Sequence, residues 1–406
     1  MSDSLLVSAR AAFDCDDWNT LIQCVREFLV QKHQGSQREQ FVRLAVQSLV
    51  LADFETRWTL VPLISKFGHG AIAPLISALH EFDPDHPSED ETDWDLLWFI
   101  ARILGNIPHP DAVAALVQVL QTSPSEDVVT AAIMALAEQG REAIDPLVKL
   151  LGHNATKAVA AQALAHIFVK DPADELRQTL MVMLQEPDAA VRATVLEALS
   201  HCHHAEITDC LLHGTQDQVA SVRQAAVMGL GMQAHRLDQA AFISALQPRL
   251  WDTDAAVARQ AAIALSRLQT AAVAAVLAPA LNDSQFPAAL KLEIVRALIW
   301  TNTPDGLQHL GHYLQTHTAK AEIYQEIAVM VGRVEAGSLH RQATELLLDI
   351  LTHHSLTQQS AMLRQAIATS LGQLGQPEAK AALTQLTQDT DERVRLHAIA
   401  ALKALP

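Results

Sequence analysis

Residues 188–199 read DAAVRATVLEAL, and residues 391–402 read DERVRLHAIAAL. Each stretch places an aspartate before an apolar helical pattern, where its side chain can act as an N-cap for the first backbone N–H groups. An arginine follows four residues later, seven residues before the closing leucine. Because seven residues make nearly two helical turns, the arginine lies on the buried stripe, and its charged head needs an anion or a carbonyl.

The same basic position recurs along the chain. We predict that it forms a ladder of ion pairs, in which the repeated aspartate of an adjacent repeat accepts the basic side chain. An alternative role for these basic residues is to line a groove for an anionic partner. The predicted structural ladder comprises Asp188, Arg192, Arg223, Asp254, Lys291, Arg364, Asp391 and Arg395, with Lys157 at the same position.

Related stretches recur at intervals of 28 to 40 residues, counted between their closing apolar residues. A period in the low thirties, filled by two helices, is typical of an α-solenoid. We therefore expect an all-α, right-handed superhelix of about eleven helix pairs. The closing residues are Phe67, Leu104, Leu136, Leu164, Leu199, Leu230, Leu265, Leu298, Val331, Leu371 and Leu402.

The intervals also indicate the domain organisation. We expect residues 1–53 to form an atypical N-terminal helical cap and residues 54–406 to form the solenoid. One interval contains an insertion at residues 81–95, EFDPDHPSEDETDWD, in which eight residues are acidic. A smaller insertion is expected at residues 352–360.

Composition limits the function. The net charge of −17 argues against binding to nucleic acid or to anionic membrane surfaces, because both need local positive potential. No apolar run approaches the length of a membrane span, and the N-terminus does not resemble a signal peptide. The four cysteines are too scattered for a disulfide framework, so we expect reduced thiols and a cytoplasmic protein.

A first helix with L-x-P-x-L-x-D, as around Pro146 and Pro279, and a second helix with D-x-x-V-R-x-x-A-x-x-A-L resemble the HEAT repeat. Three stretches further resemble the phycobilisome lyase-type HEAT proteins of phototrophic bacteria: RWTLVPLISKFG (57–68), LWFIARILGNIPHPDAVAALVQVL (97–120) and VRLHAIAALKAL (394–405). This resemblance implies that the protein is either a lyase subunit that attaches bilins to phycobiliproteins or a partner of an iron–sulfur assembly scaffold.

Two groups of residues are candidates for partner binding. Trp94 and Trp98 adjoin the acidic insertion, where with Asp90 and Glu91 they could form a hot spot for a basic partner, or could simply fill space beneath a long loop. The second group consists of arginines outside the ladder position, which could line a groove: Arg102, Arg259, Arg267, Arg296 and Arg333.

Residues 201–213, HCHHAEITDCLLH, contain ligand types that suit zinc. Their spacing straddles a turn between helices, so we expect a polar turn and no metal site in His201–His213. The sequence has no P-loop, no G-x-S-x-G and no H-E-x-x-H motif. We therefore predict no catalytic residues and no cofactor.

The sequence thus favours a non-enzymatic scaffold or adaptor that binds a protein partner on a concave face or at the acidic N-terminal end. The alternatives, which rest on the resemblance, are a bilin lyase subunit or chaperone for phycobiliprotein chromophore attachment, and a HEAT partner of an iron–sulfur assembly scaffold protein. The partner would accordingly be a phycobiliprotein or such a scaffold.

Overall fold

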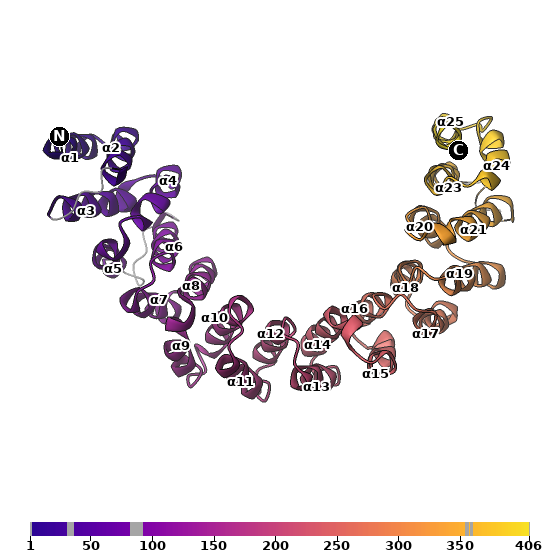
Figure 1. Cartoon of the computed structure of the whole chain (residues 1–406), viewed down its shortest axis with the longest axis horizontal. Helices are drawn as coiled ribbons and strands as arrows, with labels where there is room; N and C mark the ends of the chain where they lie inside the picture. Colours follow the sequence, from indigo (N-terminus) through magenta and orange to yellow (C-terminus); the bar gives the residue numbers. More distant parts are fainter. Residues whose placement is uncertain (1, 31–35, 82–91, 354–356, 358–359, 406) are drawn as a thin grey trace. The chain divides into compact units, whose positions relative to one another are not determined.

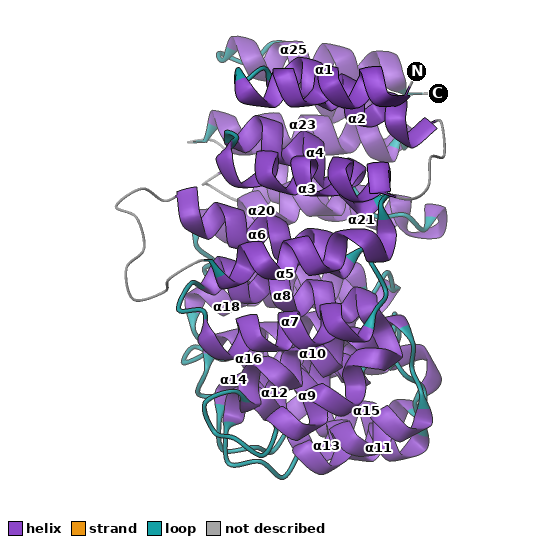
Figure 2. Cartoon of the chain, turned by 90° about the vertical axis from the view of Figure 1, so that its left-hand side faces the viewer, coloured by secondary structure: helices purple, strands orange, loops and turns teal. Residues whose placement is uncertain are grey.

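The computed structural model describes residues 2–30, 36–81, 92–353, 357 and 360–405. Regular structure is entirely helical, and the described residues form no strand (Figure 2). The chain divides into two compact units, Met1–Cys202 and His203–Pro406. No described helix combines the length and the apolar character needed to cross a membrane. The predicted all-α fold is confirmed.

In the first unit the helices alternate between two rows (Figure 1). The first helices of successive pairs are α1 (Ser2–Asp14), α3 (Ser36–Leu51), α5 (Ile72–His80), α7 (Pro110–Thr122), α9 (Ile144–Leu150) and α11 (Asp174–Met183). The second helices are α2 (Trp18–Val30), α4 (Phe54–Ser65), α6 (Thr92–Gly105), α8 (Glu126–Gln139), α10 (Lys157–Lys170) and α12 (Ala189–Leu199).

The second unit repeats this arrangement (Figure 1). Its first helices are α13 (Ala205–Gly214), α15 (Gln239–Leu246), α17 (Ala271–Asn282), α19 (Pro304–Thr316), α21 (His340–His353) and α24 (Lys380–Leu386). Its second helices are α14 (Ala220–Met232), α16 (Ala255–Ser266), α18 (Ala288–Trp300), α20 (Ala321–Val331), α23 (Ala361–Leu374) and α25 (Glu392–Ala404).

The core of each unit lies between the rows and between successive pairs. In α12, apolar residues recur at helical spacing, and Val191, Val195 and Leu199 are buried. Second helices pack against the second helix of the next pair, as α6 does on α8 and α23 on α25. Each pair therefore covers the apolar face of its neighbour, which is the stacking that an α-solenoid requires.

Small residues allow the second helices to approach closely. A Cβ atom added at Gly105 would lie 2.7 Å from the Cα atom of Ala135 on α8, and one at Gly372 would lie 2.7 Å from the Cβ atom of Ala401 on α25. No real side chain fits at such a distance without displacing the neighbouring helix. Glycine is therefore required for helix packing at these two positions.

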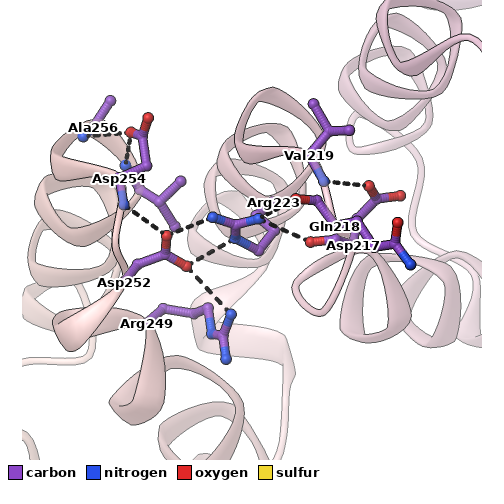
Figure 3. A network of polar contacts seen from close by, with 9 residues as sticks. Asp217, Gln218, Val219, Arg223, Arg249, Asp252, Asp254 and Ala256 are labelled. Atoms are coloured by element: carbon purple, nitrogen blue, oxygen red, sulfur yellow. Dashed lines mark hydrogen bonds and ion pairs between the residues drawn. The ribbon is translucent and has the colours of Figure 1, made fainter.

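The predicted ladder is clearest at Arg223 on α14 (Figure 3). Its Nε and Nη2 groups donate to the two carboxylate oxygens of Asp252, in the next repeat, at 2.8 and 2.6 Å. Its Nη1 group donates to the backbone oxygens of Asp217 and Gln218, just before α14. One guanidinium thus joins two successive repeats and also satisfies carbonyls in its own loop.

An ion pair with the next repeat recurs elsewhere in each unit. Arg364 donates to both carboxylate oxygens of Asp389 at 2.6 and 2.9 Å, and Lys157 donates to Glu186 at 2.7 Å. The hydrogen bond from Arg364 lowers the pKa of Asp389, and it outweighs burial, which would raise this pKa. Three further ladder residues donate to backbone carbonyls: Arg192 to Glu186 and Pro187, Lys291 to Leu281, and Arg395 to Asp389 and Thr390.

In one respect the ladder differs from the prediction. Asp188, Asp254 and Asp391 cap their own helices, each accepting from the backbone N–H two residues later. The acid that pairs with the preceding repeat lies two residues before the cap, as Asp252 does before Asp254. The cap carboxylate is already directed at its own helix N-terminus, so the preceding acid is the one that meets the arginine.

The two expected insertions lie only partly within the described residues. The acidic insertion at 81–95 is described only at residue 81 and at 92–95, where α6 begins. In the smaller insertion, Thr357 is buried, and its hydroxyl donates to the Ile350 carbonyl. α3, in the expected cap, packs against α4, in the expected solenoid. The division at residue 53 stays a prediction.

Candidate protein-binding surface

The second helices present a solvent-facing stripe of residues spaced three or four apart, which we call the second-helix face. In the first unit this stripe includes Trp58 on α4 and Trp98 and Arg102 on α6. In the second unit it includes Trp300 on α18 and Arg333, which follows α20. Three of these residues, Trp98, Arg102 and Arg333, are partner-binding residues predicted from the sequence.

An aromatic stack stands on the second-helix face of the first unit. The rings of Trp58 and Trp98 lie 5.8 Å apart at an interplanar angle of 16°. The Arg102 guanidinium lies over both indoles, 5.1 and 5.3 Å from their centroids. Buried Phe99 meets both rings edge-on. Trp58 nevertheless remains 50% exposed, so the stack is accessible to a partner. We call Trp58, Trp98 and Arg102 the indole stack.

Two cavities flank the indole stack. One, of about 580 Å³, is lined by Trp58, Arg102 and Asn106 together with Arg26 of α2. The other, of about 350 Å³, is lined by Trp98, Arg102, Asn106 and Glu138 of α8. The described lining of the larger cavity contains two guanidiniums and no carboxylate. In the smaller cavity, Glu138 is paired with Lys170 of α10.

The remaining predicted arginines fall into two groups. Arg259 and Arg296 take part in a chain of ion pairs that crosses α16, α18 and α20. In this chain Glu293 lies 3.7 Å from Arg259 and 3.0 Å from Arg296, and Arg296 also meets Glu326 at 2.6 Å. These two arginines are therefore occupied within the protein.

Arg267 and Arg333 form the second group. Both are exposed, and neither guanidinium has a hydrogen-bond or ion-pair partner among the residues that the structure describes. Both line one cavity of about 530 Å³, together with Trp300. The structure thus brings together two of the five predicted arginines, and neither guanidinium is paired with a carboxylate among the described residues.

Of the aromatic and acidic candidates for partner binding, the structure describes only the aromatic ones. Trp94 is half-buried on α6, one helical turn before Trp98. Asp90 and Glu91 lie outside the described residues. The predicted basic-partner site at these four residues stays a prediction.

The histidines and cysteines of residues 201–213 do not form a metal site. His204 is the N-cap residue of α13, and Cys210 lies within that helix. Burial raises the pKa of the Cys210 thiol, which keeps it protonated and a poor metal ligand. Across the described part of the chain, no group of three or more His, Cys, Asp and Glu residues is arranged to hold a metal ion.

The sequence analysis missed two features of the second helices. It did not predict the stacking of Trp58 on Trp98, although Trp94, Trp98 and Arg102 share one face by their four-residue spacing. It also missed Gln139, which is buried at the end of α8. The Gln139 amide donates to the carbonyls of Leu104 and Ile107 at 2.7 and 2.9 Å, so it caps the end of α6.

A stack of helix pairs with this two-row packing defines an α-solenoid. The sequence model for HEAT repeats matches residues 88–180, 144–231, 177–266, 208–288 and 344–406. The chain belongs to the HEAT-repeat family. Curated proteins include none with significant sequence similarity to it.

Several solved structures are similar to the chain at low identity. An engineered protein is 18% identical with a TM-score of 0.39, covering 93% of this chain and 98% of its own. Human deoxyhypusine hydroxylase in complex with glycerol is 19% identical with a TM-score of 0.28, covering 90% and 96%. The karyopherin Kap121p bound to Nup53p is 12% identical with a TM-score of 0.49, covering 100% and 53%. At this level the similarities carry no conclusion about function.

Proposed function

We propose that the protein is a non-enzymatic adaptor that binds a protein partner through its second-helix face, with the indole stack as an anchor. HEAT-repeat solenoids are typical of protein-interaction scaffolds, because stacked repeats present long continuous surfaces. The observation that carries the proposal is the half-exposed Trp58 held flat against Trp98 beneath Arg102.

Residue type and rigidity support this role for the stack. Tryptophan and arginine are enriched among the residues that contribute most of the binding energy at protein interfaces. Here the contacts with Phe99 and Arg102 fix the two indoles before any partner arrives. A partner would therefore order few side chains on binding, which lowers the entropic cost of association.

The cavities beside the indole stack provide space and positive charge for binding a partner. Each is large enough to accept a side chain of the partner, and Arg102 and Asn106 line both. Arg26 and Arg102 in the larger cavity favour a partner that brings a carboxylate or a carbonyl there. The predicted basic partner would instead engage the acidic residues Asp90 and Glu91.

Affinity capture tests the proposal. A tagged chain purified from its native host should bring down one partner protein in a stoichiometric amount, identified by mass spectrometry. The double variant Trp58→Ala/Arg102→Gln should lose this partner while its helicity, measured by circular dichroism, stays unchanged. Trp251→Ala is the matched control, because Trp251 is 44% exposed and lies in η4 (Gln247–Trp251) of the other unit.

Two outcomes would count against the adaptor. One is that no protein is captured in a stoichiometric amount, or that the double variant captures it as well as the parent chain does. The other is a shifted absorption band on mixing with bilin, followed by transfer to a phycobiliprotein, which would favour the lyase alternative. Capture of an iron–sulfur assembly scaffold through this face would identify the partner and support the proposal.

A further inference from the structure

Two cavities adjoin on the second-helix face of the second unit. The first, of about 530 Å³, lies over the C-terminal ends of α16, α18 and α20. The second, of about 270 Å³, lies between α20 and α23. Arg333 lines both of them, so the two cavities meet at this side chain, and their linings together extend from Ile263 to Gln373. We call the two cavities together the Arg333 groove.

The groove contains uncompensated positive charge in a chain whose net charge is −17. Arg259 and Arg296, on the same helices, are neutralised by Glu293 and Glu326. Arg267 and Arg333 have no such partner among the described residues, and Glu335 is the single carboxylate in the described lining. Guanidinium groups bind carboxylates with short, charge-assisted hydrogen bonds. The groove therefore suits an acidic ligand.

The other lining groups suit a peptide. Gln325 and Gln373 line the second cavity, and their side-chain amides have no partner in the described part of the chain. An amide can both donate to and accept from a peptide backbone. In the first cavity, Trp300 is 43% exposed beside the buried side chains of Ile299 and Met330. These residues offer an apolar surface for one side chain of the ligand.

The length of the groove suits an extended ligand. It passes four successive second helices, and packed helices lie about 8 to 10 Å apart, so it extends for roughly 25 to 30 Å. An extended chain rises about 3.3 Å per residue, so the groove accommodates roughly eight or nine residues.

We infer that the Arg333 groove binds an extended acidic peptide segment of a partner protein. Arg267 and Arg333 bind its carboxylates, Gln325 and Gln373 bind its backbone, and Trp300 packs against an apolar side chain. This inference rests on the proposed function, because it names the chemistry of a partner segment. It concerns the second unit, whereas the indole stack lies in the first.

Fluorescence anisotropy with defined peptides tests the inference on the intact chain. The probe is a dye-labelled peptide of roughly nine residues, with Glu at alternate positions, Ser between them and one central Leu. The counterpart peptides carry Gln or Lys in place of Glu. At physiological salt the Debye length is about 8 Å, so distant carboxylates of the chain repel the probe little. The Glu peptide should bind at least about tenfold more tightly than either counterpart.

Charge-matched variants locate the binding. Arg267→Gln/Arg333→Gln should weaken binding of the Glu peptide by about tenfold for each guanidinium removed. Arg236→Gln/Arg393→Gln changes the net charge equally, at two exposed arginines outside the groove, and should leave binding unchanged. Trp300→Ala should weaken binding of the Glu peptide but not of a variant peptide that lacks the central Leu.

Three results would overturn the inference. The first is equal binding of the Glu and Gln peptides, or no binding of the Glu peptide at roughly 100 μM. The second is an equal loss in the control variant, which would indicate general attraction. The third is displacement by N-acetylglutamate as effectively as by the peptide, which would indicate a site for small anions. Because these measurements need no native partner, they fail or succeed independently of the capture experiment.

Discussion

The Nε and Nη2 groups of Arg223 lie 2.8 and 2.6 Å from the two carboxylate oxygens of Asp252, and this contact joins α14 to the loop before α16. The two side chains are only 10% and 2% exposed. Arg141 and Asp171 make a similar contact at 2.7 Å between neighbouring repeats, but there the side chains are 71% and 49% exposed. The chain therefore contains a buried and an exposed version of one interaction.

Removing the buried pair should be much more destabilising than removing the exposed pair. We expect Arg223→Met to lower the free energy of unfolding by about 3 kcal/mol, because it leaves the Asp252 carboxylate buried with only Arg249 and a backbone N–H. Arg141→Met should cost less than about 1 kcal/mol, since water screens that pair. Denaturant unfolding with hydrogen exchange at α14 and α16 measures both. Equal losses would show that burial does not strengthen the ladder.

The ladder should also make stability depend on pH. The hydrogen bond from Arg364 lowers the pKa of Asp389 in the folded state. This carboxylate therefore contributes stability above its unfolded pKa of about 3.9, and the contribution is lost as the pH falls through the folded value. Asp389→Asn should be less stable than the parent chain at pH 7, and the difference should shrink below about pH 4. A difference that stays constant across that range would contradict the assignment.

Gln139 should act as a cap between repeats. Gln139→Met keeps the approximate size of the side chain but leaves the carbonyls of Leu104 and Ile107 and the His109 N–H without this partner. We expect a loss of about 2 kcal/mol in the free energy of unfolding. Gln216→Met is the control at an exposed position, with an expected change within about 0.5 kcal/mol. Comparable effects of the two changes would contradict the capping role.

We expect glycine to be required at residue 372 because α23 and α25 are in close contact there, and not because of its backbone conformation. Helix propensity alone favours Gly→Ala by about 1 kcal/mol. At Gly311 in α19 the nearest atom is 3.7 Å from the added Cβ, so Gly311→Ala should raise the melting temperature. At Gly372 the Cβ would lie 2.7 Å from Ala401, so Gly372→Ala should lower it through a cost of about 1 to 3 kcal/mol. Stabilisation by both substitutions would show that α23 and α25 are not closely packed.

The repeat pattern was sufficient to predict the fold. The seven-residue step from Arg395 to Leu402 placed the arginine on a buried stripe, and the recurrence of that step indicated stacked helix pairs. The partner acid was assigned incorrectly, because one aspartate was given both the cap and the ion pair. The sequences DTD at 252–254 and 389–391 already contain two acids with separate roles.

The binding surface was less predictable, because it depends on the register between helices. Trp58 and Trp98 are forty residues apart, and nothing local to either residue indicates that their rings stack. Similarly, Arg296 and Arg333 both lie outside the ladder position, yet Glu293 and Glu326 neutralise the first and leave the second free. Contacts between repeats therefore determine which arginines remain available to bind a ligand.

The central claim is that the second-helix face binds the partner, and hydrogen–deuterium exchange on the captured complex tests it most directly. We expect the partner to protect α4 and α6 around Trp58 and Trp98, and α18 and α20 around Trp300 and Arg333. First helices such as α7 and α19 should exchange as they do in the free chain. Protection confined to the first helices, or none on the second helices, would contradict the account.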